Sequence, residues 1–215
     1  MREAFHDQLE SVFSDLADIC ASVEVAVTKA TAALLTPDAA IAEQVISADA
    51  AIDGARERVE ENALALLSLQ APVATDLRVV VAALRMVSDL ERMGDLSVHV
   101  AKIARLRTPN SAVPEPARPT ISRMAEVAED MVHRAGEIIR SRDVDAAGLL
   151  RADDDEMDKL RRSSFTELLS KDWDHGVEAA VDIALLGRYY ERIADHAVSV
   201  ANRVVFVVTG ETPAS

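Results

Sequence analysis

The chain has 215 residues, of which 49% are hydrophobic, only 3% are aromatic and 28% are charged, and its formal net charge is −14. This length suits one large domain or two small ones, and an apolar content supplied mostly by Ala, Val, Leu and Ile suits packed helices. The negative charge excludes nucleic acid as an expected partner, because binding a phosphate backbone needs Lys and Arg to displace counterions. An anionic membrane surface also repels such a chain, so we expect membrane association only through a partner protein or a bound cation.

Helical periodicity dominates the sequence, and no segment shows the sustained alternation of apolar and polar residues that indicates a strand. The breaks between helices coincide with prolines, because proline cannot continue a helix interior. Thr36-Pro37-Asp38 and Gln70-Ala71-Pro72 each mark a break, and TPNSAVPEPARP at 108–119 is a linker near the middle of the chain. We therefore predict helices at about 3–35, 38–70, 73–107, 119–142, 144–172 and 174–209.

The location of the protein follows from what the sequence lacks. Cys20 is the only cysteine, which rules out an internal disulfide and fits a reducing compartment. The first residues, MREAFHDQLESVF, contain no apolar signal core. The longest apolar runs, at 79–84 and 204–208, fall far short of the roughly 20 residues that a membrane span requires. These features predict a soluble cytoplasmic protein.

The two halves of the chain repeat each other. Glu-Arg-x-x-Asp occurs at Glu91 and again at Glu191, 100 residues later, while Asp38 corresponds to Asp143 at an offset of 105. An internal duplication explains these matches, and three helices with short connections form an up-down-up bundle. We predict an all-α fold of two tandem, pseudo-symmetric three-helix bundles, with boundaries at 1–108 and 119–210, a linker at 109–118 and a tail at 211–215.

The repeated motif places two carboxylates on one face of a helix. Residues four apart share a face, so the acid pairs of the last helix in each half lie side by side although like charges repel. Helical geometry puts each pair at the edge of a core stripe. These pairs are Glu91 with Asp95 and Glu191 with Asp195. The predicted stripes contain Met86, Leu90, Met93, Val100, Ala101 and Ala104 in the first half and Tyr190, Ile193, Val200, Ala201 and Val204 in the second.

A second acid pair precedes each motif in the neighbouring helix. These pairs are Asp49 with Asp53 and Asp154 with Asp158. If the two helices run antiparallel, each half gathers four oxygen donors without His or Cys, which favours hard cations such as magnesium, manganese or ferric iron over a closed zinc site. The alternative is that these acids form solvated helix faces, as acidic pairs commonly do. Duplication of both pairs supports the metal hypothesis.

Other candidate sites carry less weight. Arg92 and Arg192 can serve as partners of nearby acids, and the row Arg78, Arg85 and Arg92, one heptad apart, can be a solvated stripe. The Glu-x-x-His signature of a di-iron carboxylate bundle is absent, as are a glycine-rich phosphate loop and a nucleophile motif. Trp173 is expected to pack at a helix end. The sequence therefore does not predict an enzyme.

The segments PVATDLRVVVAALRMVSDLERMGD and DIALLGRYYERIADHAVSVANRV resemble the duplicated signature of the PhoU family, and the likeness extends from the first helix to about Gly210. The resemblance implies two three-helix bundles and, in some members, multinuclear metal clusters held by these acidic motifs. The candidate ions for this chain are magnesium, manganese, iron or zinc. Carried over, the ligands are the eight acids named above. The sequence departs from the family wording ERIGDH, because Leu96 follows Asp95 and Ala194 precedes Asp195.

The resemblance also implies a function that periodicity alone does not give. PhoU proteins are adaptors that keep the phosphate-starvation response off when phosphate is plentiful, coupling the ATPase subunit of the phosphate ABC transporter to a membrane sensor histidine kinase. The expected protein is a non-enzymatic negative regulator that docks on these partners through helix faces, and a homodimer is compatible with this. Two alternatives stay open: a metal-dependent enzyme that uses the carboxylate clusters, and a purely structural helical scaffold.

Overall fold

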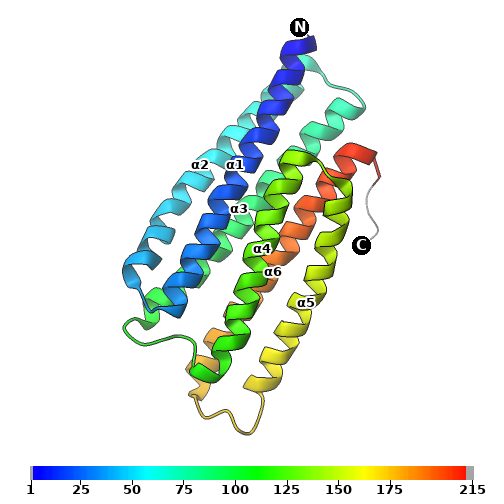
Figure 1. Cartoon of the computed structure of the whole chain (residues 1–215). Coiled ribbons are helices and arrows are strands. Elements are labelled where there is room, and N and C mark those ends of the chain that lie inside the picture. The colour runs from blue at the N-terminus through cyan, green and yellow to red at the C-terminus, as the bar shows by residue number, and fades with distance from the viewer. Residues whose placement is uncertain (1, 212–215) are drawn as a thin grey trace.

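The computed structural model describes residues 2–211, without the side chains of 2–6, 70 and 151–153, and contains six long helices in that range (Figure 1). The helices are α1 (Arg2–Leu35), α2 (Ala39–Gln70), α3 (Thr75–Arg107), α4 (Arg118–Ser141), α5 (Val144–Leu168) and α6 (Gly176–Thr209). A short 3₁₀ helix, η1 (Glu115–Ala117), precedes α4. No strand occurs among the described residues, and none of their helices is long and apolar enough to cross a membrane.

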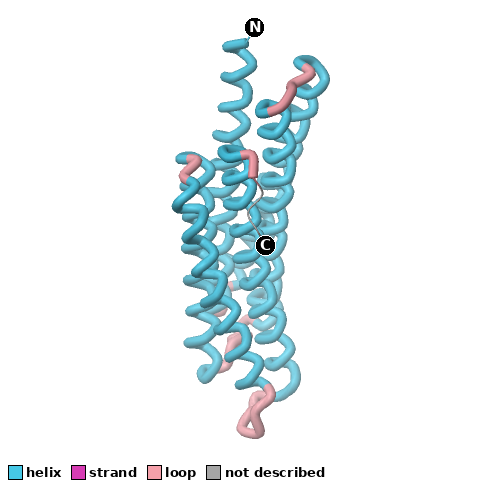
Figure 2. The backbone as a smooth tube through the Cα atoms, turned by 90° about the vertical axis from the view of Figure 1, so that its right-hand side faces the viewer, coloured by secondary structure: helices cyan, strands magenta, loops and turns pink. Residues whose placement is uncertain are grey.

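Each half folds as an up-down-up bundle, and the two bundles lie side by side (Figure 1). Helices α1, α3, α4 and α6 form the centre, where α1 packs against α4 and α3 against α6. Helices α2 and α5 lie on opposite outer sides, each packed against helices of its own half. The result is an elongated rod of long helices (Figure 2). The predicted all-α fold of two tandem three-helix bundles is confirmed.

The same local signal begins the second helix of both halves. The Asp38 carboxylate accepts hydrogen bonds from the backbone N–H groups of Ala40 and Ile41, at 2.8 and 3.0 Å. Asp143, 105 residues later, caps α5 in the same way, at 2.9 and 3.0 Å from Asp145 and Ala146. Such caps satisfy N–H groups that the first turn of a helix leaves free. The duplication seen in the sequence is therefore also a duplication of helix-starting chemistry.

Two expectations about local structure need correction. Helix α5 ends at Leu168, four residues before the predicted end, because the chain turns at Leu169–Trp173 and enters α6 through Gly176 at φ +82°. The segment 108–119 is not wholly irregular, since η1 and the first turn of α4 occupy its last five residues. The predicted domain boundaries themselves stay a prediction. Of the predicted tail, residues 212–215 lie outside the described range.

The predicted apolar stripes of α3 and α6 belong to the core, together with buried residues of the other four long helices. Every member of the two stripes is buried, with Leu90 and Ile193 fully inaccessible to solvent. Because aromatic residues are scarce, small side chains let the helices approach closely: a Cβ atom on Gly94 of α3 would lie 3.3 Å from Ile52 Cδ1 of α2. This close approach brings the acids of α2 and α3 within reach of one another.

Helices α3 and α6 cross antiparallel, which follows from the order of their contacts. The Arg107 guanidinium pairs with Asp182, the ring of His99 stacks on Tyr189 at 5.3 Å between centroids, and Asp89 accepts a hydrogen bond from His196. Since equivalent residues in the two helices are 100 apart, the pseudo-twofold axis passes near residues 94 and 194.

Candidate functional site

The first carboxylate cluster lies between α2 and α3. Asp49, Asp53, Glu91 and Asp95 are all partly buried. Burial, followed by the charges of Asp53 and Asp95, raises the pKa of Asp49. Burial, followed by the charge of Asp95 and with a smaller contribution from Asp53, raises the pKa of Glu91. The antiparallel packing of α2 on α3 therefore brings the four predicted acids close enough to repel one another.

Cationic side chains balance only part of this charge. Arg92 lies beside its own helix neighbours, with Nη1 3.1 Å from Asp95 Oδ2 and Nε 3.7 Å from Glu91 Oε2. Arg56 of α2 is directed to Glu60, one turn away, at 3.0 Å. The charges of Lys102 and His99 also act to lower the pKa of Asp49, but burial and the charges of Asp53 and Asp95 outweigh them, so the cluster keeps excess negative charge.

The second carboxylate cluster lies between α5 and α6. Burial, followed by the charges of Asp195 and Asp158, raises the pKa of Asp154, and Glu191 contributes further. Here Asp158 and Asp195 are exposed, whereas Glu191 is buried at 6% exposure. All four predicted acids again lie near one another, but only Glu191 is enclosed.

Arginines make the two clusters different. The Glu191 carboxylate accepts a hydrogen bond from Arg161 Nη1 at 2.8 Å and also pairs with Arg188. Arg161 is the counterpart of Arg56 at the repeat offset of 105, yet Arg56 forms its ion pair with Glu60 and acts on Glu91 only through its charge at longer range. The shared offset is the sequence signal for this arginine pair, and the acid motifs alone do not reveal it.

Hard cations suit the donors of the first cluster better than those of the second. Carboxylate oxygens are the ligands that magnesium, manganese and ferric iron prefer, and an uncompensated group of them attracts such ions. In the second cluster a cation would compete with Arg161 and Arg188 for Glu191. Within the described part of the chain, no three His, Cys, Asp or Glu side chains already converge in a metal-binding arrangement. Side-chain rotation toward an ion would have to complete the site, and metal binding stays a prediction.

A family comparison decides the affiliation of this duplicated helical protein. The model of the PhoU domain matches residues 16–104 and 121–204. The chain belongs to the PhoU family. Each matched segment corresponds to one half of the rod and contains one copy of the Glu-Arg-x-x-Asp motif.

Whole-length relatives support this assignment. The chain is 48% identical over 213 residues to the phosphate-specific transport system accessory protein PhoU homolog 2 of Mycobacterium tuberculosis, covering 99% of this chain and 100% of that protein. It is 46% identical to PhoU homolog 1 of Mycobacterium leprae, covering 99% and 96%. The crystal structure of PhoU from Pseudomonas aeruginosa superposes with a TM-score of 0.88 at 27% identity, covering 96% of this chain and 100% of that one.

The contact between the PhoU halves contains polar pairs that the sequence did not predict. On α3, Asp89 accepts hydrogen bonds from His196 at 3.0 Å and from Arg203 at 2.9 Å, both on α6. At the far end of α3, the Arg107 guanidinium forms a fork with the buried Asp182, at 2.6 and 3.2 Å. His196 occupies the position that Leu96 has in the first half, so this histidine binds the other half rather than a repeated cluster.

Proposed function

We propose that this chain is a regulatory accessory protein of a phosphate-specific transport system and that it keeps the phosphate-starvation response off when phosphate is plentiful. The observation that carries the proposal is the 48% identity to a mycobacterial PhoU accessory protein over that protein's whole length. Because the match covers 99% of this chain and 100% of that protein, it supports a shared role rather than one shared domain in otherwise different proteins.

We further propose that the chain acts as an adaptor between the transporter ATPase subunit and a membrane sensor histidine kinase. Its shape supports two docking surfaces, because the α2–α3 and α5–α6 connections lie at opposite ends of the rod (Figure 1). Each connection has exposed large apolar side chains. Leu69 and Val73 at the α2–α3 connection are 79% and 74% exposed, and Leu169 and Val177 at the α5–α6 connection are 82% and 80% exposed. Exposed apolar groups of this kind are typical of protein-binding surfaces.

The experiment is a phosphate-responsive reporter measured in phosphate-rich medium. We expect high output in a strain that lacks this gene and any second gene of the same family, and low output once this gene is restored. An output that stays low in the deletion strain would contradict the proposed negative regulation. Co-purification with the ATPase subunit and with the kinase, compared between the parent chain and variants with Leu69 and Leu169 changed to Ser, tests the adaptor role separately.

A metal-dependent enzyme is the second candidate, and one observation favours it. The pKa values of Asp49, Glu91 and Asp154 are raised, and carboxyl groups with raised pKa values are common in active sites. Against catalysis, these acids lie at the edge of the helix pairs, and a reaction would need an enclosed pocket beside the ion. We therefore propose a non-enzymatic role, in which bound cations would link α2 to α3 and α5 to α6.

Changing Glu91, Asp95, Glu191 and Asp195 together to Ala separates the two candidates. Loss of bound metal together with loss of reporter repression would tie the clusters to regulation, whereas retained repression would limit them to stability. Binding itself is measured by the rise in melting temperature with Mg²⁺, Mn²⁺, Fe³⁺ or Zn²⁺ over a chelator. We expect Asp49→Asn to reduce that rise more than Asp154→Asn, because arginines already engage Glu191 in the second cluster.

A further inference from the structure

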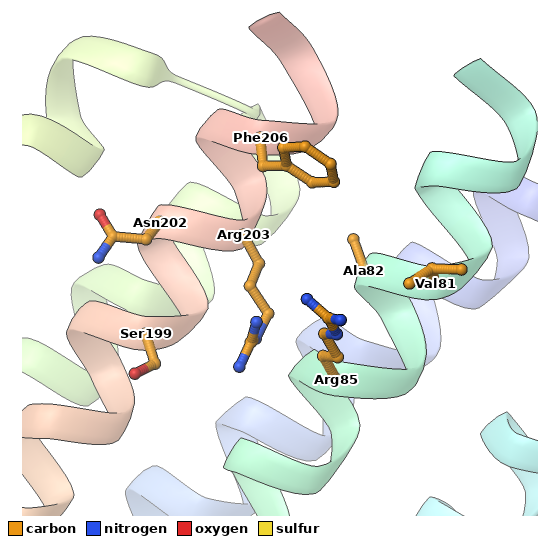
Figure 3. A pocket seen from close by; sticks show the side chains of 7 residues that line it. All are labelled: Val81, Ala82, Arg85, Ser199, Asn202, Arg203 and Phe206. Carbon is orange, nitrogen blue, oxygen red and sulfur yellow. The ribbon is translucent and has the colours of Figure 1, made fainter. Parts of the chain in front are cut away.

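A basic hollow opens between α3 and α6, where the two halves meet (Figure 3). Its volume is about 200 Å³. Arg85 projects into it from α3 and Arg203 from α6, so two guanidinium groups approach each other from opposite helices (Figure 3). Ser199 and Asn202 line the hollow on the α6 side with their polar ends directed away from the two guanidinium groups, and the Phe206 ring forms one wall (Figure 3).

The cationic charge around this hollow exceeds the local negative charge. Arg203 donates through Nε to Asp89, but Asp89 is shared with His196. Arg85 is exposed and makes no hydrogen bond or ion pair within the described part of the chain. Arg78 lies one heptad before Arg85, 5.8 Å from the centroid of the Phe206 ring. In a chain with 37 acidic and 23 basic residues, such a local excess needs an explanation other than composition.

Duplication does not account for the hollow either. The residues 100 positions from Arg85, Arg203 and Ser199 are Leu185, Ile103 and His99. The pseudo-twofold axis therefore relates this hollow to a surface of different chemistry, with no arginine at either equivalent position. The basic hollow is a feature of one side of the contact between the halves. It also gives a role to Arg85, whereas Arg78 of the same heptad row donates to the Val207 carbonyl at 3.1 Å.

We propose that this hollow binds a phosphate or phosphoryl group, held by the guanidinium groups of Arg85 and Arg203. Two facing guanidinium groups repel each other, and an anion between them removes that repulsion. The planar fork of arginine matches the oxygens of a tetrahedral oxyanion. The basic hollow rests on geometry alone, whereas the choice of phosphate among oxyanions rests on the proposed function.

The test is a titration of the purified full chain with inorganic phosphate, pyrophosphate or sulfate, each compared with sodium chloride at equal ionic strength. Calorimetry gives the affinity, and the Nε–H signals of Arg85 and Arg203 in ¹H–¹⁵N spectra report the site. We expect saturable binding of phosphate that Arg85→Gln weakens at least about tenfold, because charged hydrogen bonds are lost. Ser199→Ala should leave the affinity nearly unchanged, because the Ser199 hydroxyl points away from both guanidinium groups. Arg58→Gln, at an exposed arginine of α2, is the matched control and should leave the affinity unchanged.

Arg85 has no hydrogen-bond or ion-pair partner among the described residues, so Arg85→Gln should fold normally, and Arg85→Lys offers a second variant that keeps the charge but loses the fork. The site would be overturned if sodium chloride reproduced the shifts of the Nε–H signals, or if Arg58→Gln lost as much phosphate affinity as Arg85→Gln. Equal binding of sulfate would overturn the choice of phosphate. Tighter pyrophosphate than phosphate would identify a larger phosphoryl compound as the source. Absent phosphate binding in a chain that still represses the reporter would overturn this inference and leave the proposed function intact.

Discussion

Tyr189 and Tyr190 are sequence neighbours on α6, but their side chains have opposite environments. Tyr189 is partly exposed and stacks on His99. Tyr190 is 1% exposed, and its hydroxyl lies 3.0 Å from Thr31 Oγ1 of α1. Thr31 in turn donates to the Glu129 carboxylate of α4. A short hydrogen-bond network therefore links α6, α1 and α4 inside an otherwise apolar core, where unmade hydrogen bonds are costly.

Tyr190→Phe removes one hydroxyl from this hydrogen-bond network and keeps the aromatic ring. We expect the free energy of unfolding to fall by about 1 kcal/mol, equivalent to about 2–4 °C in melting temperature, because Thr31 loses a buried partner. Tyr189→Phe is the matched control and should cost less than about 0.5 kcal/mol. Thermal and urea unfolding of the two variants provide the measurement. Equal losses would show that the Tyr190 hydroxyl contributes no more than an exposed one.

Glu129 makes the stability supplied by this hydrogen-bond network depend on pH. Burial raises the pKa of Glu129, while hydrogen bonds from Thr31 and Thr28 lower it and the charges of Glu126 and Glu24 raise it. The net shift is upward, so the folded chain binds this proton more tightly than the unfolded chain. The resulting stabilisation is fully present below the unfolded pKa, about 4.3, and is lost as pH rises through the folded pKa.

Glu129→Gln should therefore stabilise the protein at pH 7, since the amide oxygen still accepts from Thr31 and no charge remains to be buried. The expected gain is about 0.5 kcal/mol, which is discounted because solvent reaches this half-buried group. Between pH 4 and pH 7, the free energy of unfolding of this variant should also decrease less steeply with rising pH than that of the parent chain. Glu61→Gln, at an exposed position on α2, is the control. A variant less stable than the parent at pH 7 would contradict the sign of the shift.

At the scale of helices, the sequence predicts whatever depends on local chemistry and period. The caps Asp38 and Asp143 and the prolines place the helix starts, and the 3.6-residue period identifies the buried stripes around Leu90 and Tyr190. The end of α5 was missed because Ser170, Lys171 and Asp172 include no strong terminator. There the helix ends in a local turn, in which the Ser170 N–H donates to the Glu167 carbonyl and the Asp172 N–H donates to Ser170 Oγ.

The pairs between the halves could not be predicted for a different reason. Asp89 and His196 are 107 residues apart, and neither position is repeated in the other half, where Tyr189 and Leu96 stand. Period and spacing report only which residues share a helix face. The eight acids were found because the duplication repeats them, whereas Arg85, Asp89 and Asp182 depend on how α3 crosses α6. Such single-copy contacts become visible only in the assembled structure.

The fork between Arg107 and Asp182 fastens the end of α3 to the start of α6. Asp182 is 5% exposed, so Arg107→Gln should leave a buried carboxylate without its cation. We expect a fall in melting temperature at least about twice that of Arg105→Gln, because the Arg105–Glu43 pair lies on the exposed surface and such pairs contribute little. Adding Asp182→Asn to Arg107→Gln should recover part of the loss. No recovery in the double variant would contradict the role of the buried charge.

On the scale of the whole molecule, the two halves share one core. Helix α1 packs along α4 and α3 packs along α6, so the apolar stripes of each half face the other half as well as their own neighbours. The polar pairs of Asp89 and of Arg107 also join α3 to α6. A duplicated sequence therefore does not mean two independent folding units, because neither bundle could bury its inner face alone.

The shared core predicts a single cooperative unfolding transition for the full chain. Leu16 of α1 and Leu150 of α5 belong to different halves, and both are fully buried. Leu16→Ala and Leu150→Ala should each lower the free energy of this single unfolding transition by about 2–5 kcal/mol, since either cavity weakens the common core. In scanning calorimetry the calorimetric and van't Hoff enthalpies should agree for the parent and both variants. Two separated transitions, with each variant shifting only the one belonging to its own half, would show instead that the bundles fold independently and that the contacts of α1 with α4 and α3 with α6 are weak.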